Sequence, residues 1–178
     1  ILRGLVGSEM CIRDRVRTGN KEDWSLDGFF ANNDGFRDQS GYDQQKIKVQ
    51  SNFTFSSWNA SLKATLTNLN QETAGYVNGL DSYKDEDFSK RNFNPDAYRD
   101  ANSQRISLRL TRNNGNTLNS ITPYIRSNDM KFFQHFLPGT PLEENKHKSV
   151  GLIFQKISDY ESYSLVRGLQ VDLAKAEL

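Results

Sequence analysis

The stretch Trp58-Asn59-Ala60-Ser61-Leu62-Lys63-Ala64-Thr65-Leu66-Thr67 alternates strictly, with an apolar residue at every even position and a polar or charged residue at every odd one. Successive side chains of a β-strand point to opposite faces, whereas a helix would distribute these residues around its circumference. The stretch therefore predicts a strand with one face suited to lipid or a protein core and the other suited to water.

Six further segments alternate in a similar way, so the sequence predicts an antiparallel meander of about seven long strands. The predicted strands are 24–31, 42–55, 58–68, 101–112, 117–127, 148–157 and 163–174. Pro123 weakens the fifth strand, because proline lacks the backbone donor of the ladder and favours an edge, a bulge or a strand end. Strands of globular sheets average about 5–6 residues, and these longer runs suit a tilted membrane crossing.

The connections between the predicted strands swing regularly between short and long. The short connections are 56–57, 113–116 and 158–162, and the long ones are 32–41, 69–100 and 128–147. Because antiparallel neighbours reverse direction at each link, all the tight turns fall on one edge of the sheet and all the long loops on the other. Outer-membrane barrels have this asymmetry. The predicted fold class is therefore all-β, an incomplete arc of a transmembrane β-barrel.

The composition of the chain narrows the function classes. The mean hydropathy of -0.74, with no apolar run of about 18 residues, excludes a helical membrane span but leaves barrel strands open. The 23 basic and 22 acidic residues are interspersed, so no basic footprint for nucleic acid exists. No catalytic constellation and no metal-ligand spacing is visible, so neither an enzyme, a metal site nor a cofactor is expected.

The first fifteen residues differ from the rest of the chain. Residues 1–15 show no strand alternation and contain the only cysteine, Cys11. Within them, residues 7–15 resemble translated sequencing adapter of the kind found at the ends of metagenomic open reading frames. We therefore expect residues 1–15 to be an artefactual or disordered N-terminus.

Three loop phrases resemble the barrel of TonB-dependent outer-membrane receptors. They are Asp34-Gly35-Phe36-Arg37-Asp38-Gln39-Ser40-Gly41-Tyr42, Asn94-Pro95-Asp96-Ala97-Tyr98-Arg99-Asp100-Ala101 and His135-Phe136-Leu137-Pro138-Gly139-Thr140-Pro141-Leu142-Glu143-Glu144-Asn145. The resemblance covers about residues 16–178. It implies a 22-stranded barrel plugged by a separate domain, which imports scarce nutrients with energy delivered by TonB.

The resemblance implies a function for the chain as part of a larger receptor. The family's plug domain, TonB-contacting segment and terminal aromatic strand have no counterpart in this sequence, so residues 16–178 are expected to be an internal piece of the barrel. The implied activity is uptake of a nutrient, most commonly a ferric siderophore, across the bacterial outer membrane. The implied partners are outer-membrane lipid, the plug and remaining strands, TonB and a small metal chelate.

Candidate ligand-binding residues lie in the predicted long loops. They are Arg37, Tyr76, Tyr83, Phe133 and His135, which offer charge, stacking and metal-chelate contacts to an incoming ligand. Solvated histidines and an aromatic that merely anchors its loop are the plainer interpretations. The acidic residues 85–87 lack the spacing and glycine of an EF-hand, so a solvated acidic stretch is predicted there.

Side-chain parity assigns further residues to the predicted faces. Five cations point to the polar, lumen-side face, where they line a passage, contact a plug or pair with neighbouring strands: Lys46, Lys48, Lys63, Arg105 and Arg109. Arg167 instead shares the parity of Leu165 and Leu169. Because arginine facing lipid is costly, it should lie near the membrane interface unless Gly168 forms a bulge.

Five aromatic residues near strand ends fit an interfacial girdle: Trp24, Tyr42, Phe55, Trp58 and Tyr163. Two other functions remain open. A passive porin-like channel would lack the plug, and a soluble ligand-binding β-sandwich would not enter a membrane.

Overall fold

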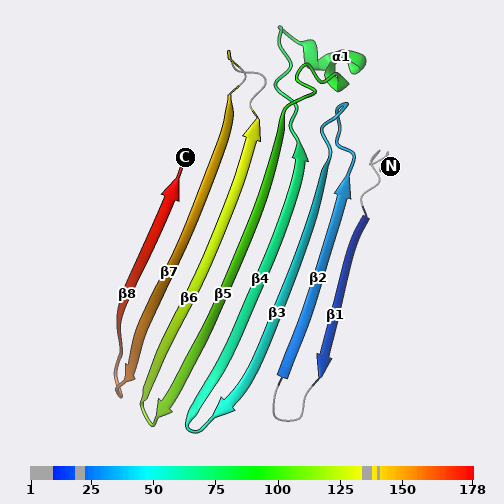
Figure 1. Ribbon diagram of the computed structural model, residues 1–178. Helices are drawn as coiled ribbons and strands as arrows, with labels where there is room; N and C mark the ends of the chain where they lie inside the picture. Colours follow the sequence, from blue (N-terminus) through cyan, green and yellow to red (C-terminus); the bar gives the residue numbers. More distant parts are fainter. Residues whose placement is uncertain (1–9, 19–22, 134–137, 140) are drawn as a thin grey trace.

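The chain forms one antiparallel sheet of eight strands in sequential order, β1 to β8 (Figure 1). The structure, a computed structural model, describes residues 10–18, 23–133, 138–139 and 141–178. The strands are β1 (Met10–Thr18), β2 (Asp23–Asn33), β3 (Tyr42–Phe55), β4 (Trp58–Glu72), β5 (Tyr98–Asn114), β6 (Thr117–Phe133), β7 (Leu142–Asp159) and β8 (Ser164–Glu177). A short 3-10 helix, η1 (Ser82–Lys84), and the helix α1 (Glu86–Lys90) lie between β4 and β5.

The seven predicted strands correspond to β2 through β8, and the all-β meander is confirmed. The eighth strand is an addition. β1 pairs with β2 from Met10↔Asn32 to Thr18↔Trp24, although no strand alternation marks its sequence. Ladder hydrogen bonds use backbone groups, so pairing does not require an alternating side-chain pattern. That residues 1–15 are artefactual stays a prediction.

Most strands extend further toward the long-loop edge than predicted. β4 ends at Glu72, β5 begins at Tyr98, β6 ends at Phe133 and β7 begins at Leu142. These extensions are polar on both faces over much of their length, so the alternation fades while the backbone pairing continues. The tight turns agree closely with prediction, and Gly115 adopts a φ of 60° in the turn between β5 and β6.

Pro123 lies in the interior of the sheet, and not at an edge, a bulge or a strand end. On the β7 side it pairs with Leu152. On the β5 side the ladder is interrupted between Ser107↔Tyr124 and Leu110↔Ile121, yet the register is the same before and after the gap. The missing N–H group therefore breaks hydrogen bonding on one side without shifting the pairing.

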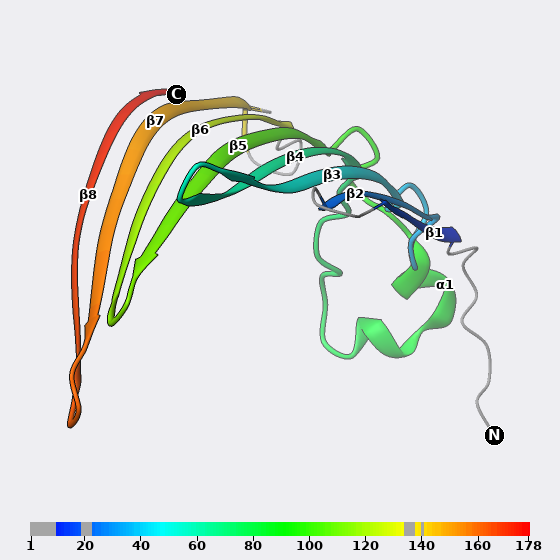
Figure 2. The ribbon, with the colours of Figure 1, turned by 90° about the horizontal axis from the view of Figure 1, so that it is seen from below.

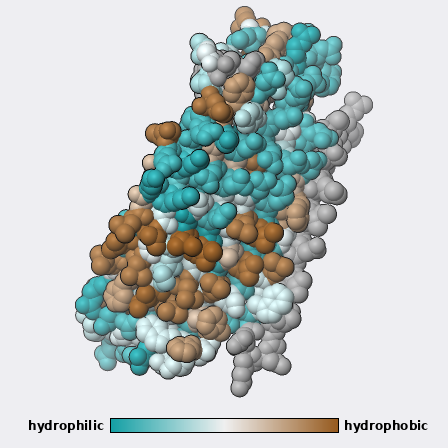
Figure 3. All heavy atoms as spheres, viewed as in Figure 1, coloured by the Kyte–Doolittle hydropathy of each residue, from teal (hydrophilic) through white to brown (hydrophobic). Residues whose placement is uncertain are grey.

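The two faces of the sheet differ in chemistry. Figure 2 shows the sheet curving into an arc, with the segment 73–97 on the concave side. The convex face, seen in Figure 3, carries a band of hydrophobic side chains toward the tight-turn edge. One row of this band joins Leu62 to Leu108 and, across the interruption of the ladder, continues through Pro123, Leu152 and Val171.

The apolar band is not covered by any other part of the described chain. Buried apolar residues in the described region are only Ala60, Ala97 and Tyr124, whereas Leu152 and Leu169 on the convex face are 46% and 65% exposed. A β-sandwich would need a second sheet packed on this face. The described strands form a single sheet, so the band faces outward.

Cations bracket the apolar band on β7 and β8. Lys148 pairs with Lys175 on the long-loop side, and Lys156 pairs with Arg167 on the tight-turn side. Positions 148 and 156 are eight residues apart in β7, about 27 Å along a strand. With the tilt of about 35–45° usual in barrels, this gives a band roughly 20 Å tall, close to the about 25 Å of outer-membrane barrels.

Arg167 lies at the tight-turn edge of the apolar band, and its location at a membrane interface stays a prediction. Gly168 pairs with Gln155 in unbroken register, so no bulge changes the parity of β8. Four of the five girdle aromatics, Trp24, Phe55, Trp58 and Tyr163, lie at the tight-turn edge, and Tyr42 lies at the opposite one.

In the described part of the chain, no helix is long and apolar enough to cross a membrane.

Candidate functional site

The concave face of the sheet carries a group of cations, here called the basic wall. Strand register places its members on β3 to β6, on the face opposite the apolar band: Lys46, Lys48, Lys63, Arg105, Arg109 and Arg126. At the positions of β3 to β6 that share this face there is no Asp or Glu, and the carboxylates on the neighbouring strands β2, β7 and β8 are Asp23, Asp27, Glu143, Asp159 and Asp172. Cations therefore outnumber carboxylates over this part of the wall, which favours an anionic occupant.

Pairing between neighbouring strands does not neutralise the five cations that the sequence assigned to this face. Within the described residues, none of the five forms an ion pair with a carboxylate. Arg105 instead lies over the ring of Tyr124, and Nε of Arg109 donates to Oγ of Ser120 at 3.3 Å. The wall therefore keeps most of its positive charge.

Tyr124 is the centre of the best-packed cluster on the concave face. It is 5% exposed, and the guanidinium groups of Arg105 and Arg126 lie 5.7 and 5.8 Å from its ring centroid. Nε2 of Gln170 donates to its hydroxyl at 3.2 Å. Arg105 and Arg126 are direct cross-strand partners, and the electron-rich ring offsets the repulsion that two like charges would otherwise create.

Arg126 also connects the cluster to β7 and β8. Its Nη2 donates to Asp172 Oδ2 at 2.6 Å, and its Nε donates to Oγ of the buried Ser149 at 2.5 Å. This charge-assisted hydrogen bonding fixes the guanidinium across two strand boundaries. Of the six cations in the wall, Arg126 is therefore the one that forms an ion pair among the described residues, and Lys48 lies directly opposite Asp27 in the register.

Gly151 provides the space that Tyr124 occupies. The two residues are direct partners across β6 and β7, and a Cβ at Gly151 would lie 2.4 Å from Cζ and Oη of the ring. A glycine covered by a cross-strand aromatic ring is a recognised device in β-sheets. Any larger residue at position 151 would have to displace the ring from its two arginines.

Two long loops lie together at the edge opposite the tight turns. The loop 34–41 joins β2 to β3, and the loop 73–97 joins β4 to β5. The backbone N–H of Asp38 donates to the carbonyl of Lys90 at 2.9 Å, and Nδ2 of Asn92 donates to the carbonyl of Gln39 at 2.8 Å. The longer loop is therefore attached to the shorter one and is held on the concave side (Figure 2).

The loop 73–97 also has internal order. Asp85 caps α1 by accepting a hydrogen bond from the N–H of Phe88 at 2.9 Å, and Phe88 packs against Phe93 with ring centroids 5.1 Å apart. Nζ of Lys90 contacts Glu86 at 2.7 Å, which lowers the pKa of the Glu86 carboxyl and raises that of Lys90. Asp85 therefore caps a short helix, and Glu86 and Asp87 form its exposed first turn.

The structure places four of the five candidate ligand residues. Arg37 donates from Nη1 to the carbonyl of Gly75 and so joins the two loops beside Tyr76. Tyr76 and Tyr83 are 72% and 69% exposed on the loop 73–97. Phe133 ends β6 and packs on Tyr98 with ring centroids 5.8 Å apart, as the anchoring interpretation predicted.

The fifth candidate, His135, lies outside the described residues. Among the other four, Arg37 contacts the residue that precedes Tyr76. Whether any of the five binds a ligand stays a prediction. In the described part of the chain, no three metal-ligating side chains gather in one place.

The sequence interpretation missed the central group of the wall, which comprises Tyr124, Arg126 and Asp172. A usable signal was present, because Tyr124 and Arg126 share the polar parity of the fifth predicted strand. Pro123 masked it by weakening that strand. The contact of Arg126 with Asp172 bridges two strand boundaries, and no local pattern predicts it.

Comparisons with known proteins identify a shared fold. No protein-family model and no curated protein sequence matches the chain. Among solved structures it is similar to the ferric-catecholate import receptor Fiu of E. coli K12 in its closed form, with a TM-score of 0.72 and 12% identity. The match covers 96% of this chain and 30% of the receptor's chain. This chain therefore has the fold of part of an import receptor's chain.

Proposed function

We propose that the chain is part of the barrel wall of a bacterial outer-membrane transporter that resembles the TonB-dependent receptors. The observation that carries this proposal is the outward-facing apolar band on the convex face, bracketed by cations and backed by a polar concave face. Lipid would solvate the apolar side chains of the band, and water in the lumen would solvate the polar side chains of the other face. The fold shared with an import receptor supports the same assignment.

The loop-rich edge of the sheet is the extracellular one in this proposal, because outer-membrane barrels place their long loops outside and their tight turns in the periplasm. The loops 34–41 and 73–97 then lie at the entrance to the lumen, where Arg37, Tyr76 and Tyr83 meet an incoming ligand. Phe133 ends β6 at the same edge, and His135 follows it two residues later in the sequence.

The cargo we propose is an anionic metal chelate, a ferric siderophore. Its support is the uncompensated positive charge of the basic wall below the loops, which attracts anions and raises their local concentration. The energy source in this proposal is TonB, acting through a plug domain within the lumen. The chain's role is to supply wall and loops, and it performs no chemistry on the cargo.

Uptake by the whole receptor that contains this chain tests the proposal. Cells that depend on one ferric catecholate for iron should lose growth when the receptor is deleted and when TonB is removed. The double variant Lys48→Gln/Lys63→Gln removes two cations of the basic wall that form no ion pair within the described residues. It should therefore weaken uptake of the anionic chelate more than uptake of a neutral one.

Two results would reject the transporter assignment. Uptake that is independent of TonB would indicate a passive channel. Recovery of the receptor in the soluble fraction of the cell would remove the membrane assignment altogether.

A further inference from the structure

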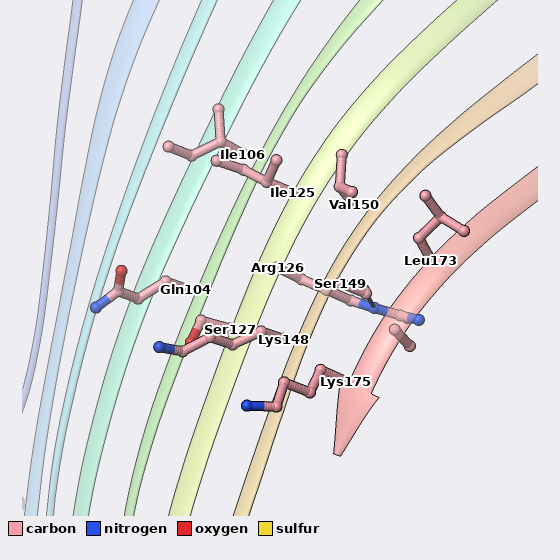
Figure 4. Close-up of a pocket in the computed structure, with 11 residues that line it drawn as sticks. Gln104, Ile106, Ile125, Arg126, Ser127, Lys148, Ser149, Val150, Leu173 and Lys175 are labelled. Atoms are coloured by element: carbon pink, nitrogen blue, oxygen red, sulfur yellow. Dashed lines mark hydrogen bonds between the residues drawn. The ribbon is translucent and has the colours of Figure 1, made fainter. Parts of the chain in front are cut away.

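The convex face contains a hollow of about 650 Å³ near the edge of the apolar band that faces the long loops (Figure 4). Its lining comes from β5 to β8, chiefly from two adjacent rows of outward-facing residues. Figure 4 shows the two rows as separate groups of side chains. Most of the lining residues belong to the face opposite the basic wall, whereas Arg126, Ser149 and Ala174 have the parity of the concave face. No residue of the loops 34–41 and 73–97 lines the hollow.

The row nearer the tight turns is apolar. It runs across four strands through Ile106, Ile125, Val150 and Leu173, which are direct partners in the register. These side chains are 42–69% exposed, so they contact little of the protein on that face. In the proposed orientation they meet the acyl chains of the outer leaflet.

The row nearer the long loops is polar and cationic. It contains Gln104, Ser127, Lys148 and Lys175, each two residues from its apolar neighbour on the same strand. Lys148 and Lys175 are direct cross-strand partners on the same face. Like charges directly opposite each other destabilise a sheet unless an anion lies between or beside them.

The described chain compensates only part of this charge. Nζ of Lys175 contacts Glu177 at 2.5 Å, whereas Lys148 has no carboxylate partner among the described residues. A second anion with hydrogen-bond acceptors would complete the pair. The apolar row lies directly beside the two lysines, on their tight-turn side. An anion that suits both rows therefore carries a hydrocarbon chain that extends over the apolar row.

We propose that the hollow binds the phosphorylated headgroup of an outer-leaflet lipid. Lys148 and Lys175 contact the phosphate, Gln104 and Ser127 supply further hydrogen-bonding groups, and the row of Ile106 to Leu173 contacts the first acyl carbons. A phosphate monoester offers several acceptor oxygens to the two ammonium groups and supplies the negative charge that Lys148 lacks among the described residues. The inference rests on the proposed membrane location and goes beyond it, because it names a lipid site on the outside of the wall.

The test uses the whole receptor that contains this chain, purified from membranes in an uncharged maltoside detergent. Cys11 is replaced by serine, and a fluorophore is attached at Asp129→Cys, which lies on the same face two residues beyond Ser127. Phosphatidic acid is titrated against phosphatidylcholine, and inorganic phosphate serves as a separate arm. Phosphatidic acid should give a saturable response that neither other probe gives.

Paired variants locate the response. Lys148→Gln/Lys175→Gln should weaken the apparent affinity for phosphatidic acid about tenfold or more, because both cations that contact the phosphate are lost. Lys156→Gln/Arg167→Gln removes a cross-strand cation pair from the same two strands at the far edge of the band and should change it less than about twofold. Lys148→Arg/Lys175→Arg should keep binding and shows that the site tolerates substitution.

Four results would overturn the inference. They are an equal response to phosphatidylcholine, a matching response to inorganic phosphate alone, equal losses in the two glutamine double variants, and no response in the properly folded receptor. The last would leave the transporter proposal intact, provided that TonB-dependent uptake persists. Absence of the receptor from the membrane fraction would instead reject both.

Discussion

The convex and concave faces of the same strands differ in which kinds of side chain they expose and which they bury. On the convex face the large apolar side chains are the exposed ones, whereas on the concave face the best-buried aromatic, Tyr124, is surrounded by arginines and polar groups. A water-soluble domain buries its apolar face and solvates its polar one. The comparison fits the proposed contact of the convex face with lipid, and it shows that the best-packed cluster of the concave face is largely polar.

The largest expected effect comes from leaving the apolar convex face without lipid or detergent. Expressed alone without detergent, the 178-residue chain should aggregate, because its apolar band is uncovered and β1 and β8 each have one unpaired edge in the described sheet. Size-exclusion chromatography with light scattering measures this. A soluble monomer that melts cooperatively would refute the membrane assignment.

Introducing one arginine on each face of β7 tests the difference between the two faces. Leu152→Arg places a cation in the middle of the convex band and should cost about 2–4 kcal/mol of folding free energy in a bilayer. Ile153→Arg, the matched change one residue along β7, faces the lumen side and should cost much less. Urea titration of the receptor in vesicles gives both values, and equal costs would mean that the faces are not lipid and water.

Packing on the concave face is tested at Gly151. Gly151→Ala should destabilise the sheet by about 1–3 kcal/mol, because its Cβ would meet the Tyr124 ring at 2.4 Å. In Tyr124→Leu the obstructing ring is gone, so the same alanine should then cost markedly less. A double-mutant cycle from denaturant unfolding measures this coupling, and strictly additive effects would show that the ring does not depend on the glycine.

The smallest expected effect is in the loop 73–97, which is not part of the sheet. Interaction with Lys90 lowers the pKa of Glu86, so this pair stabilises α1 above the ordinary pKa of a glutamate. The contribution is lost as the pH falls through the lowered pKa. Hydrogen exchange of residues 82–93 should accelerate slightly over that range, and Glu86→Gln should remove this pH dependence while β5 to β7 stay unchanged.

The sequence predicted the parts of the fold that depend on one strand at a time. Alternation in 58–67 identified a strand and its faces, and loop lengths identified the two edges of the sheet. The strand ends near Glu72 and Leu142 were missed, because polar residues on both faces leave no pattern. β1 was missed for a related reason, since backbone pairing can form without alternation.

The candidate site was harder to predict because its contacts connect distant segments. Arg37 meets the carbonyl of Gly75, 38 residues away in the chain, and Arg126 reaches Asp172 across β7. Parity correctly placed the five cations on the concave face but left ion pairing as the plainer interpretation. Only the register shows that Tyr124 and not a carboxylate lies beside Arg105.

The most direct test of the two-faced wall is a spin-label scan along β7, from position 149 to 154, in the whole receptor within a bilayer. Labels at Val150, Leu152 and Phe154 should be accessible to dissolved oxygen, which concentrates in lipid. Labels at Ser149 and Ile153 should be shielded from it, giving a period of two residues, and position 151 is left unlabelled because a side chain there would meet the Tyr124 ring. A scan without this alternation, or with the two sets exchanged, would contradict the assignment of the convex face to lipid.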